Sequence, residues 1–141
     1  MPATGQSLIA YLAVALGSAA GGVARYACGL WAASRIDSGF FLSSSIAATL
    51  FVNVSGSFLI GIFAALTGPG GRWAGASLLP ELLMVGLMGG YTTFSAFSLQ
   101  TLALLREGRL GLALANVAAS VVLCLIAVWL GYVLGNTLEP A

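Results

Sequence analysis

The chain has 141 residues, of which 60% are hydrophobic and 6% are charged, and its mean hydropathy is +1.04. Soluble domains contain about 25% charged residues, so the composition indicates a membrane protein. A net charge of +1 without a basic cluster argues against nucleic acid as a partner. The chain has no histidine, which excludes histidine-based triads, histidine metal ligands and imidazole proton relays. No enzymatic activity is therefore expected.

A helix that crosses a bilayer needs about 20 apolar residues. Four stretches reach this length, and the loops between them are too short to hold a soluble domain. We therefore expect residues 1–141 to form a single all-α membrane domain with both termini on one side. The first stretch is too long for the core of a signal peptide, so we expect it to be retained. The predicted helices are residues 8–33, 45–66, 78–105 and 110–134.

The first predicted helix carries Gly17, Gly21, Arg25 and Gly29 at steps of four, so these residues share one face. Gly17 and Gly21 form a GxxxG motif, which lets another helix backbone approach closely. Arg25 could simply anchor the helix by reaching toward the end at Trp31. Alternatively, it holds a partner helix or attracts an anion. We favour a structural and electrostatic role over direct contact with a solute.

The second predicted helix has a stripe of small and polar residues at the same spacing: Thr49, Asn53, Ser57 and Gly61. Asn53 lies close to the middle of this helix. A buried amide at that depth must hydrogen-bond to protein or line a polar path. Taken alone, Asn53 would more often join two helices than line a pore.

The third predicted helix contains a Gly89-Gly90 pair and a Thr92-Thr93 pair near its midpoint. We expect this helix to be broken at mid-membrane. No water is present at that depth, so a break is tolerated only where protein, an ion or a wet cavity satisfies the freed backbone groups. Freed carbonyl oxygens suit an alkali cation, and two breaks could meet on the axis of an inverted dimer to hold one ion. The break is therefore a candidate site.

The fourth predicted helix places Asn116, Ser120 and Cys124 on one face. Polar stripes on two helices beside a broken third helix favour a polar path over simple packing. Both Cys28 and Cys124 lie inside apolar segments, so no disulfide is expected.

The predicted path has hydrogen-bond donors and acceptors but no carboxylate near its middle. Cation and proton-coupled transporters generally need an intramembrane carboxylate, so the path suits an anion or a neutral solute. Phe94 and Phe97 follow the break three residues apart, and the positive edge of an aromatic ring attracts anions. The polar residues expected near mid-membrane are Asn53, Thr92, Thr93, Ser95, Ser98, Asn116 and Ser120.

The charge difference between the two membrane sides is small. Arg35, Arg106 and Arg109 lie on one side and Arg72 on the other, which weakly favours the first side as cytoplasmic. Such a weak bias allows insertion in both orientations. Four short helices hardly enclose a path, and an antiparallel homodimer would restore the inverted repeat of larger transporters.

The motifs of the first three helices together resemble the Fluc (CrcB) family of fluoride channels. The resemblance rests on Gly21-Gly-Val-Ala-Arg25-Tyr, on the run from Thr49 to Gly61 that contains Asn53 and Gly56, and on Gly86-Leu-Met-Gly-Gly-Tyr-Thr-Thr-Phe-Ser-Ala-Phe97. The last run is the most specific, and the resemblance covers nearly the whole chain. This chain has Ala96 where relatives often have threonine, and Cys124 where serine or threonine is expected.

The resemblance implies an antiparallel, dual-topology homodimer in the lipid of the cell inner membrane. Its two pores would conduct fluoride passively and selectively, which lowers cytoplasmic fluoride. A structural Na+ that is not transported would be held by the backbone carbonyls of Gly89 and Thr92 from both subunits. By the same resemblance, Phe94 and Phe97 would bind fluoride through their ring edges. Asn53 and Ser120 would line the pore, and Arg25 matches the family's arginine in the first helix. Ser98 and Asn116 complete the predicted pore, as polar residues expected near mid-membrane.

Two other functions remain open at this point. A small dual-topology multidrug/proton antiporter has a similar length and helix count, but it should carry a membrane-embedded glutamate in its first helix, and this chain has none. An intramembrane serine protease would use Ser55 or Ser57 as nucleophile, but the chain contains neither histidine nor lysine as a general base.

Overall fold

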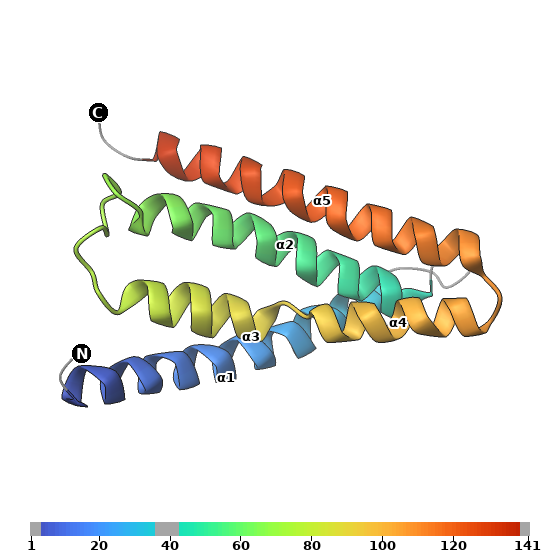
Figure 1. The fold of residues 1–141 in the computed structure, drawn as a ribbon, viewed down its shortest axis with the longest axis horizontal. Coiled ribbons are helices and arrows are strands. Elements are labelled where there is room, and N and C mark those ends of the chain that lie inside the picture. Colours follow the sequence, from blue (N-terminus) through green and yellow to red (C-terminus); the bar gives the residue numbers. More distant parts are fainter. Residues whose placement is uncertain (1–3, 36–42, 139–141) are drawn as a thin grey trace.

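A computed structural model describes residues 4–35 and 43–138, and this part of the chain is helical without any strand (Figure 1). The four predicted spans are confirmed as helices that are long and apolar enough to cross a membrane. The third span, Pro80–Arg106, comprises three successive elements, the first of them a π-helix. The elements are α1 (Thr4–Arg35), α2 (Ser44–Thr67), η1 (Pro80–Met88), α3 (Gly89–Tyr91), α4 (Phe94–Arg106) and α5 (Leu110–Thr137).

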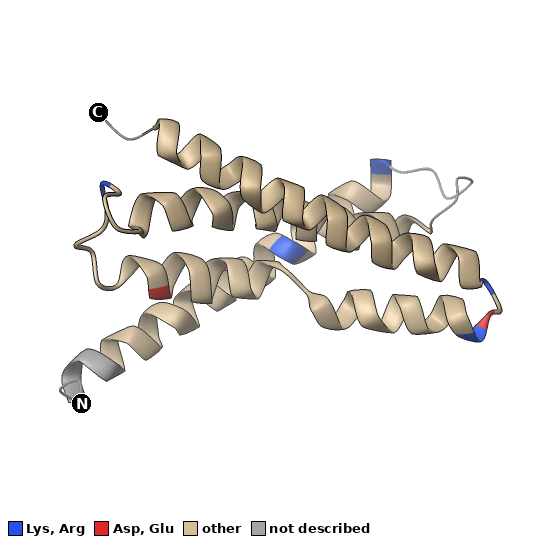
Figure 2. Cartoon of the chain, turned by 45° about the horizontal axis from the view of Figure 1, so that its top comes forward, with Lys and Arg blue, Asp and Glu red and all other residues tan. Residues whose placement is uncertain are grey.

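Successive spans run in opposite directions, so α1 begins and α5 ends at the same end of the bundle (Figure 1). The two later turns, before the third span and before α5, use glycine where the backbone is left-handed, with φ of +86° at Gly70 and +71° at Gly108. Charged residues gather at the two ends of the bundle, apart from one basic position within α1 (Figure 2). Asp37 and Glu139, which the sequence places at helix ends, lie outside the described residues.

The GxxxG motif of α1 packs closely against another helix backbone, as predicted, and the structure shows that this backbone belongs to the third span. A Cβ atom at Gly17 would overlap the carbonyl oxygen of Leu82, and one at Gly21 would overlap that of Leu87. Gly90 provides the matching gap in α3, where a Cβ would clash with the backbone of Ser18. These close approaches bring α1 within side-chain reach of the residues that follow α3.

Glycines also bring α2 and α5 into backbone contact. A Cβ at Gly61 would overlap the carbonyl oxygen of Val128, and one at Gly131 would overlap that of Phe58. Lipid tails are as apolar as the helix surfaces, so close van der Waals packing, and not the exclusion of water, holds such a pair together.

Gly131→Ala is expected to destabilise the protein by about 1–3 kcal/mol, because the overlapping Phe58 oxygen belongs to a helix backbone that cannot move aside. Gly111→Ala in the same helix is the matched control, since a Cβ there has no neighbour within 4 Å and alanine favours the helix. Thermal unfolding of the purified protein in detergent measures both variants. Equal melting temperatures would contradict the importance of this contact.

Candidate functional site

The third span leaves helical geometry at Thr92 and Thr93. Thr92 has φ −81° and ψ 160°, and Thr93 has φ −150° and ψ 109°, so both residues are extended between α3 and α4. Gly89 and Gly90 are still helical. Gly90 serves the packing against α1, where a Cβ would meet the backbone of Ser18, and the threonine pair forms the interruption.

Asn53 of α2 supplies hydrogen bonds to the interrupted backbone. Its Nδ2 donates to the carbonyl oxygen of Thr93 at 3.0 Å, and its Oδ1 accepts from the Thr93 amide at 2.8 Å. In a continuous helix the Thr93 amide would bond to the Gly89 carbonyl. The Gly89 carbonyl thus loses that partner, and Gly89 lies on an exposed part of the chain.

Arg25 reaches the interruption from α1. Its Nη1 donates to the carbonyl oxygen of Thr92 at 3.3 Å. This contact joins α1 to the third span at the interruption. The two threonine hydroxyls complete the local network. Thr92 Oγ1 donates to the Met88 carbonyl at 2.9 Å, and Thr93 Oγ1 caps α4 by accepting from the Ala96 amide at 3.2 Å.

A cavity of about 410 Å³ lies beside the interruption, between α2, α4 and α5. Four of the predicted pore residues line it together, namely Asn53, Phe94, Phe97 and Ser120. Ser57 and Cys124 also line it, so polar residues from both predicted stripes meet there. None of the residues that line it carries a charge.

Phe94 and Phe97 form the aromatic part of this cavity. Their ring centroids are 5.3 Å apart, and the ring planes are tilted by 51°. Phe94 is 78% exposed although it opens a helix directly after the interruption. The single chain therefore surrounds Phe94 only in part.

Two predicted pore residues lie outside the residues that line this cavity. Asn116 is buried between α4 and α5, and its Nδ2 donates to Thr101 Oγ1 at 2.9 Å. Ser98 donates its hydroxyl proton to the Phe94 carbonyl at 2.9 Å, one turn back in its own helix. The polar stripe of α5 thus divides, because Ser120 and Cys124 face the cavity whereas Asn116 joins two helices.

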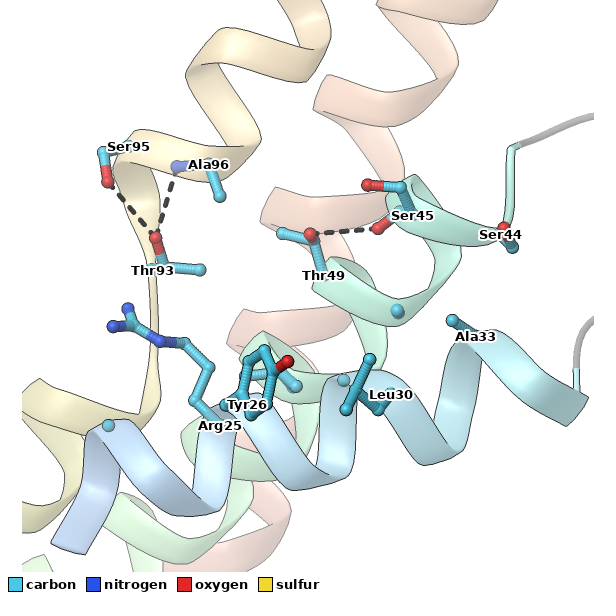
Figure 3. A pocket seen from close by; sticks show the side chains of 14 residues that line it. Arg25, Tyr26, Leu30, Ala33, Ser44, Ser45, Thr49, Thr93, Ser95 and Ala96 are labelled. Carbon is cyan, nitrogen blue, oxygen red and sulfur yellow. Dashed lines mark hydrogen bonds between the residues drawn. The ribbon is translucent and has the colours of Figure 1, made fainter.

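A second cavity, of about 600 Å³, lies on the other side of Thr93, between α1, α2 and the start of α4 (Figure 3). The Arg25 side chain extends into it from α1 toward the extended segment, and the hydroxyls of Ser45 and Thr49 face it from α2 (Figure 3). Gln100 of α4 joins this polar wall by donating to Thr49 Oγ1 at 2.8 Å. Thr93 lines both cavities, so the extended segment separates them.

Sequence reasoning missed three residues that shape the interruption. Tyr91 bonds to the hydroxyl of Ser55, and Gly56 leaves room for the side chain of Thr92. Spacing gave no sign of the tyrosine, because an aromatic residue inside an apolar segment is usually a packing residue. Gly56 stood beside the α2 stripe, and its proximity to Asn53 was the available signal.

Residues 12–132 match the family described as CrcB-like protein, Camphor Resistance (CrcB). The chain belongs to the CrcB family. This confirms the resemblance drawn from the motifs of the first three helices. The matched region contains both cavities and every residue of the hydrogen-bond network at the interruption.

Relatives of this CrcB-family chain include proteins named fluoride-specific ion channel FluC. One from Opitutus terrae is 50% identical over 123 residues, which cover 87% of this chain and 89% of the relative. One from Rhodospirillum rubrum is 51% identical over 123 residues, covering 87% of this chain and 92% of the relative. A FluC 1 protein from Rhodopseudomonas palustris is 46% identical over 129 residues, covering 92% and 88%.

Asn53→Ala is expected to loosen the interruption, because both backbone groups of Thr93 lose their partner and an unsatisfied buried group costs about 1–3 kcal/mol. Hydrogen exchange of the amides of residues 92–96 should accelerate. Asn136→Ala, at the exposed end of α5, is the matched control and should leave this exchange unchanged. Wild-type exchange in the Asn53 variant would show that the pairing does not hold the segment.

Proposed function

We propose that this protein is a passive, fluoride-selective channel of the cell inner membrane that exports cytoplasmic fluoride. The observation that carries the proposal is the 410 Å³ cavity, where Asn53, Phe94, Phe97 and Ser120 meet without a charged neighbour. Membership in the CrcB family and the names of its relatives support fluoride as the ion.

The cavity contains hydrogen-bond donors that no protein group uses, and these donors could bind an anion. An asparagine amide has two N–H groups, and only one of those on Asn53 is bound to Thr93. Its second N–H and the Ser120 hydroxyl are available to a desolvated fluoride ion. The tilted rings of Phe94 and Phe97 add positive edges. Neutral donors bind an anion weakly enough for it to leave again, which conduction requires.

A passive mechanism fits the distribution of acidic residues. Proton coupling generally needs a carboxylate within the path, and the two acidic residues that the structure describes, Glu81 and Glu107, both lie at helix ends. The nearest to a span interior is Glu81, in the first turn of η1. The antiporter alternative has no observation in its favour.

We further propose that two chains form an antiparallel homodimer. The cavity wall is incomplete in one chain, since Phe94 is largely exposed. A second, inverted copy would complete the wall around Phe94 and create two equivalent pores. The weak arginine bias between the two ends is compatible with both orientations.

The backbone at the interruption fits a structural Na+ at the centre of such a dimer. The described residues contain no group of three or more metal-binding side chains, so backbone oxygens would have to be the ligands. The Gly89 carbonyl has lost its helical partner to Asn53, and the Thr92 carbonyl has a second lone pair besides the one that accepts from Arg25. Two carbonyls from each chain would give four ligands. A buried positive charge there would favour anions in both pores.

Purified protein in fluoride-loaded liposomes tests the function, with a fluoride electrode as the readout. Fluoride efflux should far exceed chloride efflux, and it should need no proton gradient. Phe94→Ile and Phe97→Ile should each reduce the efflux at least tenfold, because a ring edge that binds the ion is lost.

Phe51→Ile is the control for these two variants, because Phe51 packs against Trp31 with ring centroids 5.6 Å apart and does not line the cavity. It should conduct like the wild type. If the wild type releases no fluoride, or if the Phe94 and Phe97 variants match Phe51→Ile, the proposed path is wrong.

Crystals grown in saturating Na+ test the dimer and its ion together. We expect two inverted chains with a cation between the Gly89 and Thr92 carbonyls of both. Thr92→Ala is expected to keep the ion, because only the backbone oxygen is a ligand. A monomer, a parallel dimer, or only water at these carbonyls would overturn this part of the proposal.

A further inference from the structure

Tyr91 is the last residue of α3 and is buried, with 7% of its surface exposed. Its phenol oxygen lies 2.9 Å from Oγ of Ser55, which belongs to α2. A phenol group in an apolar cluster needs a polar partner, and Ser55 provides it. The contact joins α2 to the residue directly before the extended pair.

The direction of this hydrogen bond follows from the other contacts of Ser55. Its Oγ lies 2.8 Å from the Phe51 carbonyl oxygen and 3.1 Å from that of Val52. Both carbonyls are acceptors, and a serine hydroxyl has one proton to donate. Ser55 therefore donates to its own helix and accepts the proton of Tyr91.

The ring of Tyr91 reaches Ser55 by lying across Gly56. A Cβ at Gly56 would be 3.0 Å from Cδ1 of Tyr91 and would overlap Cγ2 of Thr92. Val52 and Met88 pack with Tyr91 in one buried apolar cluster. The ring is thus held by packing, and its hydroxyl is held by Ser55.

Residues of α2 therefore bind the chain on both sides of Thr92. Ser55 binds Tyr91 before it, and Asn53 binds Thr93 after it. Successive residues of a helix are rotated by about 100°, so Asn53 and Ser55 lie on different sides of α2. The two contacts consequently fix the rotation of the extended segment as well as its distance from α2. Asn53 binds Thr93 and Arg25 binds Thr92, so the bond between Ser55 and Tyr91 adds a separate constraint on the residue before the extended pair.

We propose that Tyr91 and Ser55 form a positioning pair that aims the Phe94 ring at the ion path and the Thr92 carbonyl at the proposed Na+ site. This inference rests on the proposed function for its effect on conduction. Neither residue lines the 410 Å³ cavity, so the pair acts through the backbone and not by contact with the ion.

Tyr91→Phe and Ser55→Ala test the pair in the liposome assay. Each removes the hydrogen bond and leaves the packing almost intact. Each should lower fluoride flux about fivefold, the effect of one interhelical hydrogen bond, and should also lower the ratio of fluoride to chloride flux. The double variant should be no worse than either single variant, because both remove the same bond.

Tyr132→Phe and Ser34→Ala are the matched controls. Tyr132 is 48% exposed, and Ser34 bonds only within its own helix. Reduced folding alone would lower the flux but leave the flux ratio unchanged, so an unchanged ratio in Tyr91→Phe overturns the inference. Additive losses in the double variant also overturn it.

Hydrogen exchange of residues 92–95 separates this inference from the proposed function. If the wild type conducts no fluoride, the proposed function fails. The pair is still supported as a positioning device if exchange accelerates in Tyr91→Phe and Ser55→Ala but not in the controls. If wild-type flux is normal and exchange is unchanged in both variants, the positioning role is wrong and the proposed function stands.

Discussion

The pairing of Asn53 with the backbone of Thr93 is the interaction on which the remaining structure depends. A helix that stops inside an apolar span exposes amides and carbonyls, each of which costs several kcal/mol in hydrocarbon. Asn53 satisfies one amide and one carbonyl with a single side chain. It also takes the Thr93 amide away from the Gly89 carbonyl, and that oxygen becomes available to another ligand.

The other groups at the interruption are satisfied from three directions. The Thr92 amide still reaches the Met88 carbonyl at 2.9 Å, so α3 ends with its last hydrogen bond intact. Arg25 covers the Thr92 carbonyl from α1, and Thr93 caps the following helix with its own hydroxyl. These contacts explain how two extended residues persist between two helices in an apolar span.

Small residues make these contacts possible because they let the helices approach one another closely. Asn53 has two rotatable bonds, so α2 must lie close to the third span. Gly56 permits this approach by leaving room for Tyr91 and Thr92. Gly21 and Gly90 do the same for α1, which carries Arg25. Glycines that allow close packing therefore lie near the side chains that bind the interruption, Asn53 and Arg25. A larger residue in place of one of these glycines would move the helices apart and lengthen those hydrogen bonds.

The sequence alone predicts the four spans, because each is an apolar run of sufficient length, and it predicts close packing of α1, because GxxxG lets another helix backbone approach. It also identified Asn53 as a residue that needs a partner, since an amide in an apolar span cannot remain unpaired. The specific motif after Gly86 indicated the family. Each of these features can be recognised within a single segment, without knowing which other segment it contacts.

Which polar residues meet depends on how the helices pack against one another. Asn116 and Ser120 share one face of α5, yet one joins α4 and the other lines the cavity, because α4 covers only part of that face. Likewise, the sequence could not rank the glycine pair against the threonine pair as the interruption. Gly90 has to be small because the backbone of Ser18 in α1 packs against it, and Thr93 is extended because Asn53 takes its amide. Both causes lie on other helices, and the local sequence contains neither.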